Sequence, residues 1–221
     1  MISLRLLLTV ALISATIFSG QGNEQFTQVL ADNEKLVREY TYKQRTEVKY
    51  NGEEKVVRIS QVRFEANGKR EVVPTDDPEN DTTSEKLPKG PLRHAKAKAQ
   101  QDKLRDYAER LAQLFEGYLP VNPQKLRSSF SAAQNEAQAN DVALTFTNYL
   151  KSGDRIVLFL DSGTRKLKRI EITSSLDDDA VTGLAQMASA PNGARYPSRT
   201  EIKSPSKKLE IVRTEYDFVR R

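Results

Sequence analysis

Three strand-like segments joined by two tight turns, over residues 142–175, constrain the fold of this chain more than any other feature. Residues 142–150, 155–161 and 165–175 are rich in β-branched and aromatic side chains, and the linkers between them are KSGD and SGT. Connections this short join antiparallel strands, whereas a parallel pair needs a crossover of about a dozen residues or more. The segment therefore predicts the centre of an antiparallel sheet that the rest of the chain extends or covers.

Further strands are predicted before this centre. Residues 40–50 alternate between aromatic or apolar positions and charged ones, which is typical of a strand with one covered face. Asn51-Gly52 and Asn67-Gly68 are strong hairpin-turn signals. They connect residues 40–50 to strands predicted at 55–66 and 69–73.

The apolar positions of residues 55–66 change face along the strand. Val57 and Ile59 share one phase of the alternation, and Val62 has the other. A β-bulge adds one residue to a strand and so reverses the phase of the residues after it. We therefore predict a bulge near Ser60 and Gln61.

Two segments have the three-and-four apolar spacing of amphipathic helices. The first covers residues 23–39, and the second covers residues 90–119, where Pro91 occupies a favourable first position. Residues 121–141 are expected to be a connector, with one helical turn around residues 131–139.

Three last strands are predicted at residues 180–190, 196–204 and 208–220, which makes about nine strands and two helices. Short connections favour an antiparallel meander, and a sheet of this size curls. The expected fold class is mainly β (α+β), with a single curled antiparallel sheet and two covering helices. One domain, residues 23–221, should contain all of these elements.

The N-terminal segment has the layout of a secretory signal peptide. A short region with one positive charge, Arg5, precedes an apolar run at residues 6–18, and Gly20 and Gly22 supply small residues for cleavage. Residues 1–22 are therefore expected to direct export and to be cleaved near Gly20–Gly22. The alternative is an uncleaved anchor in the inner membrane, although the run is short for a bilayer span.

Two charged segments stand out from the pattern of strands. Residues 74–89 contain three prolines and five acidic residues with almost no apolar content, which predicts a mobile acidic loop. The helix after it begins with a basic half that carries Arg93, Lys96, Lys98 and Lys103. These side chains are candidates for contact with phosphates or an anionic membrane surface. The alternative is an ordinary solvated helix face, folded against the acidic loop or free of it.

No residue pattern indicates catalysis. The chain has no cysteine, which excludes disulfides, thiolate catalysis and zinc–thiolate sites. Its one histidine, His94, lies among lysines without a serine–aspartate partner. Residues 177–179, Asp-Asp-Asp, lack the spacing of a calcium loop and are expected to form a polar turn. We expect no enzyme activity, cofactor, metal or nucleic-acid partner.

The central strands carry apolar side chains on both faces. Ile156 and Leu158 point one way, and Val157 and Phe159 point the other. One face can pack under a helix, while the other must meet a second layer or line a cavity. The sequence does not favour either a closed core or a cavity. Strand phase nominates as cavity lining Tyr40, Tyr42, Val48, Leu144, Phe146, Leu158, Leu160, Ile170 and Ile172.

The order of elements resembles that of the periplasmic lipoprotein carriers of the LolA/LolB type and related lipoprotein-sorting-like proteins. The resemblance rests on residues 33–49, on the hairpin after them, and on residues 192–211. It implies a half-barrel, meaning an unclosed β-barrel with a helical lid, and a cavity for lipid acyl chains. It also implies a periplasmic location and no catalysis. The acidic loop and the long basic helix depart from that pattern, so the resemblance does not transfer lipoprotein specificity.

Two functions are the leading hypotheses. The first is a non-catalytic periplasmic binding or carrier protein that shields a lipid, or the acyl group of a lipidated protein, in a hydrophobic cavity. The alternative is an interaction or scaffold protein of the cell envelope with a filled core, which acts through its basic helix. A hydrolase comes third, because no nucleophile–base pattern is present.

Overall fold

The computed structural model describes residues 20–77, 91–138 and 140–221. Most of the predicted signal peptide and of the predicted acidic loop therefore lies outside the described residues. The strands are β1 (Tyr40–Tyr50), β2 (Glu53–Phe64), β3 (Arg70–Pro74), β4 (Gln134–Gln138), β5 (Asp141–Thr147), β6 (Arg155–Asp161), β7 (Leu167–Leu176), β8 (Asp179–Ser189), β9 (Arg195–Ser204) and β10 (Leu209–Arg220). The helices are α1 (Gly20–Val37), α2 (Pro91–Glu116), α3 (Pro123–Ser129) and the 3₁₀ turn η2 (Phe130–Ala132).

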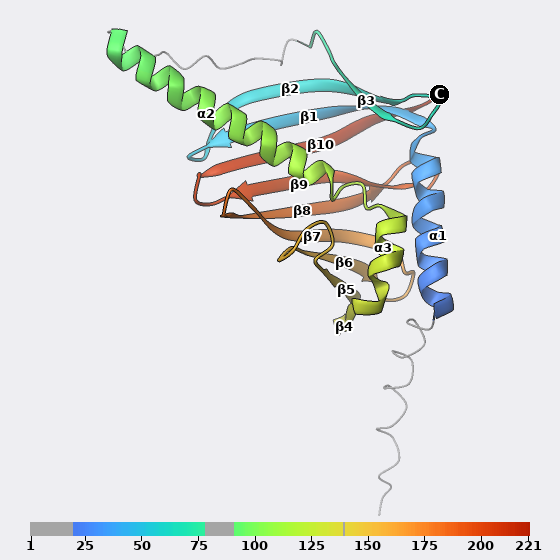
Figure 1. The fold of residues 1–221 in the computed structure, drawn as a ribbon. Coiled ribbons are helices and arrows are strands. Elements are labelled where there is room, and N and C mark those ends of the chain that lie inside the picture. The colour runs from blue at the N-terminus through green and yellow to red at the C-terminus, as the bar shows by residue number, and fades with distance from the viewer. Residues whose placement is uncertain (1–19, 78–90, 139) are drawn as a thin grey trace, which may run out of the picture.

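The strands form one antiparallel sheet in the order β3-β2-β1-β10-β9-β8-β7-β6-β5-β4. Almost every strand pairs with its neighbour in sequence through a short turn, and β10 joins the two halves because it inserts between β1 and β9. The edge strands β3 and β4 do not pair with each other, so the sheet curves without closing (Figure 1). The predicted fold class is confirmed, with ten strands where about nine were expected.

The hairpin turns form where the sequence places them. Asn51 and Gly52 have φ of 53° and 80°, and Gly68 has φ of 83°. These left-handed conformations are what asparagine and glycine adopt most readily.

The predicted bulge at Ser60 and Gln61 is wrong. Residues 57–62 of β2 pair with β1 in unbroken register, and the irregularity falls at Lys55, between the pairs Val48–Val56 and Lys49–Glu54. The change of apolar phase has another cause: Val57 and Val62 lie on opposite faces of the strand, and both are buried.

The connector before the central strands also differs from expectation. The helix lies at Pro123–Ser129, and residues 134–138 form the edge strand β4 instead of a helical turn. Asn122 starts this helix, since its Oδ1 accepts hydrogen bonds from the backbone N–H groups of Gln124 (2.9 Å) and Lys125 (3.0 Å). The Asn-Pro pair at residues 122–123 is a helix-start signal in the sequence that the prediction missed.

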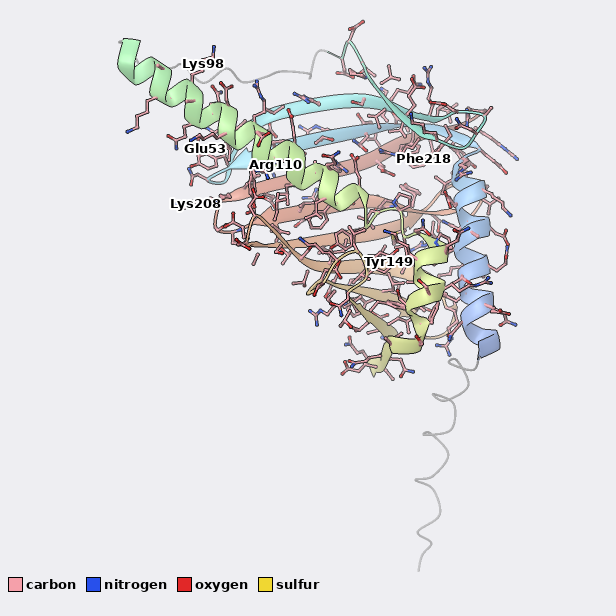
Figure 2. The ribbon with its side chains drawn as sticks, viewed as in Figure 1. Glu53, Lys98, Arg110, Tyr149, Lys208 and Phe218 are labelled. Atoms are coloured by element: carbon pink, nitrogen blue, oxygen red, sulfur yellow. The ribbon has the colours of Figure 1, made fainter. Side chains whose placement is uncertain are left out.

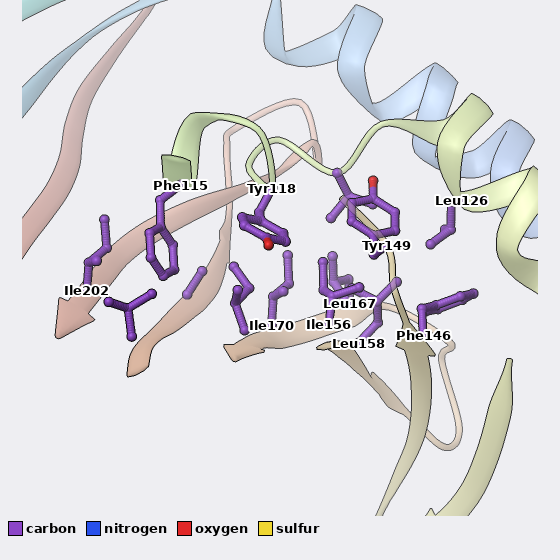
Figure 3. Packing of buried hydrophobic residues seen from close by; sticks show 14 of the residues in the cluster. Phe115, Tyr118, Leu126, Phe146, Tyr149, Ile156, Leu158, Leu167, Ile170 and Ile202 are labelled. Carbon is purple, nitrogen blue, oxygen red and sulfur yellow. The ribbon is translucent and has the colours of Figure 1, made fainter. Parts of the chain in front are cut away.

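The core fills the face of the sheet that α2 crosses. The C-terminal half of α2 and the turn after it bury Leu111, Phe115 and Tyr118 in the core cluster. Figure 3 shows Phe115 and Tyr118 pointing toward Ile170 and Ile202 of the sheet. Phe115 lies directly over Gly183, where a Cβ atom would stand 2.1 Å from its ring. α3 and α1 cover the lower strands next to it (Figure 1), and Phe26 of α1 makes an edge contact with Phe130.

The opposite face of the central strands carries a small apolar cluster of Ala143, Val157 and Phe159. The guanidinium group of Arg169 lies 3.5 Å from the centre of the Phe159 ring. Long polar side chains can cover apolar surface in this way while their charge stays in water. On this face, therefore, the apolar cluster is small and a charged side chain lies over it.

Candidate functional site

Six of the predicted lining residues lie together in the packed core. Each is at most 2% exposed and belongs to the cluster that Phe115 and Tyr118 cover; they are Leu144, Phe146, Leu158, Leu160, Ile170 and Ile172. Their role in ligand binding stays a prediction, because they meet protein side chains in this structure.

The three other predicted lining residues lie on β1. Tyr42 is buried and stacks on Phe218 with ring centres 4.6 Å apart, and Tyr40 packs edge-on against the same ring. Burial raises the pKa of Tyr42 to about 12. Val48 is half-buried and, unlike the two tyrosines, borders an open space between α2 and the sheet.

This open space is a trough of about 1490 Å³ between α2 and the sheet. Its roof is residues 97–116 of α2, and its floor is formed by β3, β2, β1 and the start of β10. Figure 2 shows α2 passing over these strands, with Lys98 toward its N-terminal end and Arg110 nearer the packed core.

The trough exists because the two halves of α2 differ in sequence. The C-terminal half carries the buried side chains Tyr107, Leu111 and Phe115, which hold it against the sheet. Residues 95–103 are alanines, lysines, glutamines and one aspartate, almost all of them exposed. A helix with no apolar stripe has nothing to bury, so this half does not pack onto the strands.

One part of the trough is apolar. Val48 and Val56 are cross-strand partners on the floor, and Ile211 of β10 pairs with Val48 from the other side. Leu104 of α2 lies opposite them in the roof. Apart from Val48, sequence reasoning missed these residues, and Ile211 joins Val48 and Val56 only because β10 pairs with β1.

The next part of the floor is charged. Arg70 donates a hydrogen bond of 2.5 Å to Oε1 of Gln44 and lies 3.9 Å from Glu215. Arg213 lies 3.4 Å from the exposed carboxylate of Glu116. Burial lowers the pKa of Arg213, and burial also raises the pKa of Glu215 to about 7 despite the two arginines nearby. The buried floor thus holds more positive than negative charge.

The whole lining is cationic. Its ten basic residues are Lys55, Arg58, Arg70, Lys98, Lys103, Arg105, Arg110, Lys207, Lys208 and Arg213. Its five acidic residues are Asp102, Asp106, Glu109, Glu116 and Asp177. A concave surface with such an excess concentrates anions from solution.

The predicted basic contacts lie on the outer half of α2. Lys96, Lys98 and Lys103 are exposed, and the last two border the trough. Arg93 belongs to α2, but its side chain is outside the described part of the structure, as is that of His94.

Asp177 and Asp178 form a turn, as predicted, whereas Asp179 is the first residue of β8; two of the three aspartates make ion pairs. Asp177 binds Arg110 at 2.6 Å, and Asp179 binds Lys207 at 3.0 Å. Within residues 20–77, 91–138 and 140–221, no group of three or more metal-ligating side chains has the geometry to hold an ion. No helix in the same ranges combines the length and the apolar character that a membrane span requires.

Fold and site together define an open antiparallel sheet with a helix-roofed trough. The chain is similar in structure to a LolA superfamily protein from Nitrosomonas europaea, at 11% identity and a TM-score of 0.47 over 88% of this chain and 93% of the other. It is also similar to a domain from Vibrio parahaemolyticus described as an outer membrane lipoprotein-sorting protein, at 10% identity and a TM-score of 0.49, covering 90% and 93%. A DUF1329 family protein from Desulfovibrio piger has 11% identity and a TM-score of 0.42, covering 89% and 92%.

No family model matches the sequence, and no curated protein matches it either.

Proposed function

We propose that this protein is a non-catalytic carrier that holds a lipid, or the acyl group of a lipidated protein, in the trough under α2. The observation that carries the proposal is the trough itself. Its volume of about 1490 Å³ exceeds the roughly 300–1,000 Å³ of pockets for drug-sized ligands. We further propose that the protein works in the periplasm, free or held at the inner membrane by its N-terminal segment.

The apolar strip of Val48, Val56, Ile211 and Leu104 supports an acyl chain as cargo. Each methylene group removed from water contributes about 0.8 kcal/mol. Affinity should therefore rise about fourfold for each added carbon until the strip is filled. Because α2 packs firmly on the sheet only in its C-terminal half, a chain that enters beneath the other half first meets the half-buried Val48 and Val56. Ile211 belongs to the packed core, and the strip thus continues from the trough into the core.

The chemistry of the lining supports binding without catalysis. Among the described residues around the trough there is no histidine or cysteine, and the hydroxyl groups come from Thr46, Tyr50, Ser60, Tyr107 and Ser206. The hydroxyl of Ser206 donates to Asp179 at 2.6 Å, and no described side chain beside it is an imidazole that could act as a base.

The direct test is lipid content. The full-length protein would be purified from its native envelope, and organic extracts would be examined by mass spectrometry for co-purified lipid. A fluorescent fatty-acid probe then measures the affinity of the delipidated protein. Absence of lipid together with no probe binding would overturn the carrier function.

Two variants link binding to the trough. Val48→Glu and Val56→Glu place a carboxylate in the apolar strip and should each weaken probe binding at least about tenfold. Val219→Glu is the matched control, because Val219 is 61% exposed and lies outside the trough. Equal loss in all three variants would show that the trough is not the binding site.

A second function, contact with the envelope through the basic helix, is favoured by one observation. The core under the central strands is filled, and Lys96, Lys98 and Lys103 are exposed on the half of α2 that stands away from it.

A further inference from the structure

We infer that the ligand of the trough is an anionic amphiphile, a single-chain lipid whose phosphate or carboxylate group binds Arg58 and Arg213 while its chain lies on the apolar strip. The inference rests on the proposed function and names the class of its cargo. The register of three adjacent strands supports it.

The register places two arginines on either side of one small residue. Thr46 of β1 pairs with Arg58 of β2 on one side and with Arg213 of β10 on the other. Directly paired residues point to the same face of a sheet, so both guanidinium groups border the trough. Their Cα atoms are two strand spacings apart, roughly 10 Å, a span that two long side chains can close onto one anion.

Arg213 is only partly neutralised, and Arg58 has no carboxylate partner among the described residues. Arg213 is 18% exposed, and its one ion pair among the described residues, at 3.4 Å, is to Glu116, which is itself 56% exposed. Its Nε is buried and has no hydrogen-bond partner among the residues described. Arg58 makes no ion pair within the same part of the chain, and Glu215 lies nearest to Arg70. A partly buried cation without a full partner is costly, and an anion from solution would remove that cost.

An apolar row lies directly beside the cationic row. Val56, Val48 and Ile211 each lie two positions along their strand from Arg58, Thr46 and Arg213. They are also paired in register with one another. Residues two apart on a strand share a face and are roughly 7 Å apart. The floor therefore presents charge and apolar surface side by side, which matches a molecule with an anionic head and an apolar tail.

Arginine rather than lysine at both positions favours a planar or tetrahedral oxyanion. A guanidinium group donates two parallel hydrogen bonds to a carboxylate or phosphate. Thr46 stands between the two arginines and supplies a hydroxyl group. A lipid head group and free phosphate share this chemistry, and probes with and without an alkyl chain separate the two sources.

Titration calorimetry with three probes tests the inference: dodecyl phosphate below its micelle concentration, dodecanol, and inorganic phosphate. The wild-type protein should bind dodecyl phosphate at least about tenfold more tightly than either of the others. Arg213→Gln and Arg58→Gln should each reduce dodecyl phosphate affinity about tenfold and leave dodecanol unchanged. Arg199→Gln is the control, because Arg199 lies outside the trough lining and pairs with Glu201 at 3.0 Å.

The outcomes are distinct. Equal affinity for dodecyl phosphate and dodecanol in wild type and variants would overturn the inference and leave the carrier function standing. Phosphate alone binding as tightly as dodecyl phosphate would also overturn it, since the site would then be a phosphate site. Failure of both chain-bearing probes to bind would remove the carrier function itself. Arg58 is exposed, so Arg58→Gln should fold and keeps the test decisive if Arg213→Gln does not.

Discussion

The hydroxyl group of Tyr118 donates a hydrogen bond of 2.6 Å to Oδ2 of Asp154, in the turn between β5 and β6. Asp154 is 2% exposed, and its carboxylate also accepts from the backbone N–H groups of residues 149, 150 and 151. The same hydroxyl lies 2.9 Å from that of Ser174 on β7. This contact ties the turn after α2, the helix that roofs the trough, to β7 and to the turn between β5 and β6.

Tyr118→Phe should therefore lower the free energy of unfolding by about 1–3 kcal/mol, because a buried carboxylate loses one donor. Urea unfolding followed by circular dichroism measures the change. Tyr50→Phe is the control, since the hydroxyl of Tyr50 makes no hydrogen bond within the described residues, and its stability should be unchanged. Equal effects of the two substitutions would contradict a specific role for the Tyr118–Asp154 pair.

Gly183→Ala should also destabilise the fold, by about 1–3 kcal/mol, because the added Cβ would meet the Phe115 ring at 2.1 Å. Gly163→Ala is the matched control, since the nearest atom to its Cβ is 3.6 Å away. In the double variant Gly183→Ala/Phe115→Leu the two losses should not add, since the smaller side chain leaves room for the methyl group. Additive losses would show that the contact does not limit packing.

Stability should depend on the charge of Glu215. Burial raises the pKa of this carboxyl to about 7, and the charged or titratable groups facing it are Arg70, Arg213, Tyr42 and Tyr196. Because the folded state binds the proton more tightly than the unfolded state, stability falls as pH rises from about 4.5 to 7. A rise of the pKa from 4.5 to about 7 corresponds to a loss of about 3 kcal/mol in the free energy of unfolding.

Glu215→Gln keeps this position neutral at every pH. The variant should match the wild type near pH 5 and exceed its free energy of unfolding by about 3 kcal/mol near pH 8. Glu71→Gln is the control, because the pKa of Glu71 is lowered by its hydrogen bond to Arg63 and the substitution should bring no gain at high pH. A pH profile of Glu215→Gln that parallels the wild type would contradict the prediction.

The basic half of α2 should bind anionic membranes if the second function holds. Replacing Lys96, Lys98 and Lys103 by glutamine should weaken binding to vesicles that contain phosphatidylglycerol by about 1 kcal/mol per lysine. Co-sedimentation at two salt concentrations measures this, and the attraction should fall as salt rises. Lys125, Arg127 and Lys151, replaced in the same way, provide a charge-matched control away from α2. Vesicle binding that is equal in both triple variants would contradict the role of this helix.

Sequence reasoning succeeded where the signal was local. The period-two alternation of residues 40–50 and the Asn-Gly turns at residues 51–52 and 67–68 correctly placed the first hairpins. The short linkers after residues 150 and 161 correctly predicted antiparallel pairing at the centre. Each of these features depends on a few consecutive residues and on backbone geometry that those residues prefer.

Sequence reasoning missed the open space for a non-local reason. Strand phase identified which side chains of β5 to β7 share a face, yet which face a helix fills depends on where α2 ends. Phe115 and Tyr118 cover Ile156, Leu158 and Ile172, so the trough lies on the same face of the sheet but over β3, β2, β1 and the start of β10.

Sequence by itself determined every strand except β4, most of the turns and the antiparallel character of the sheet, because these features depend on local preferences and short connections. The tertiary structure alone decided that Arg213, from the end of the chain, stands in register with Thr46 and Arg58, from its beginning. That neighbourhood exists only because β10 inserts beside β1, a pairing of the two ends of the chain that no local pattern records. The two arginines on either side of Thr46, and with them the proposed ligand, depend on that single pairing.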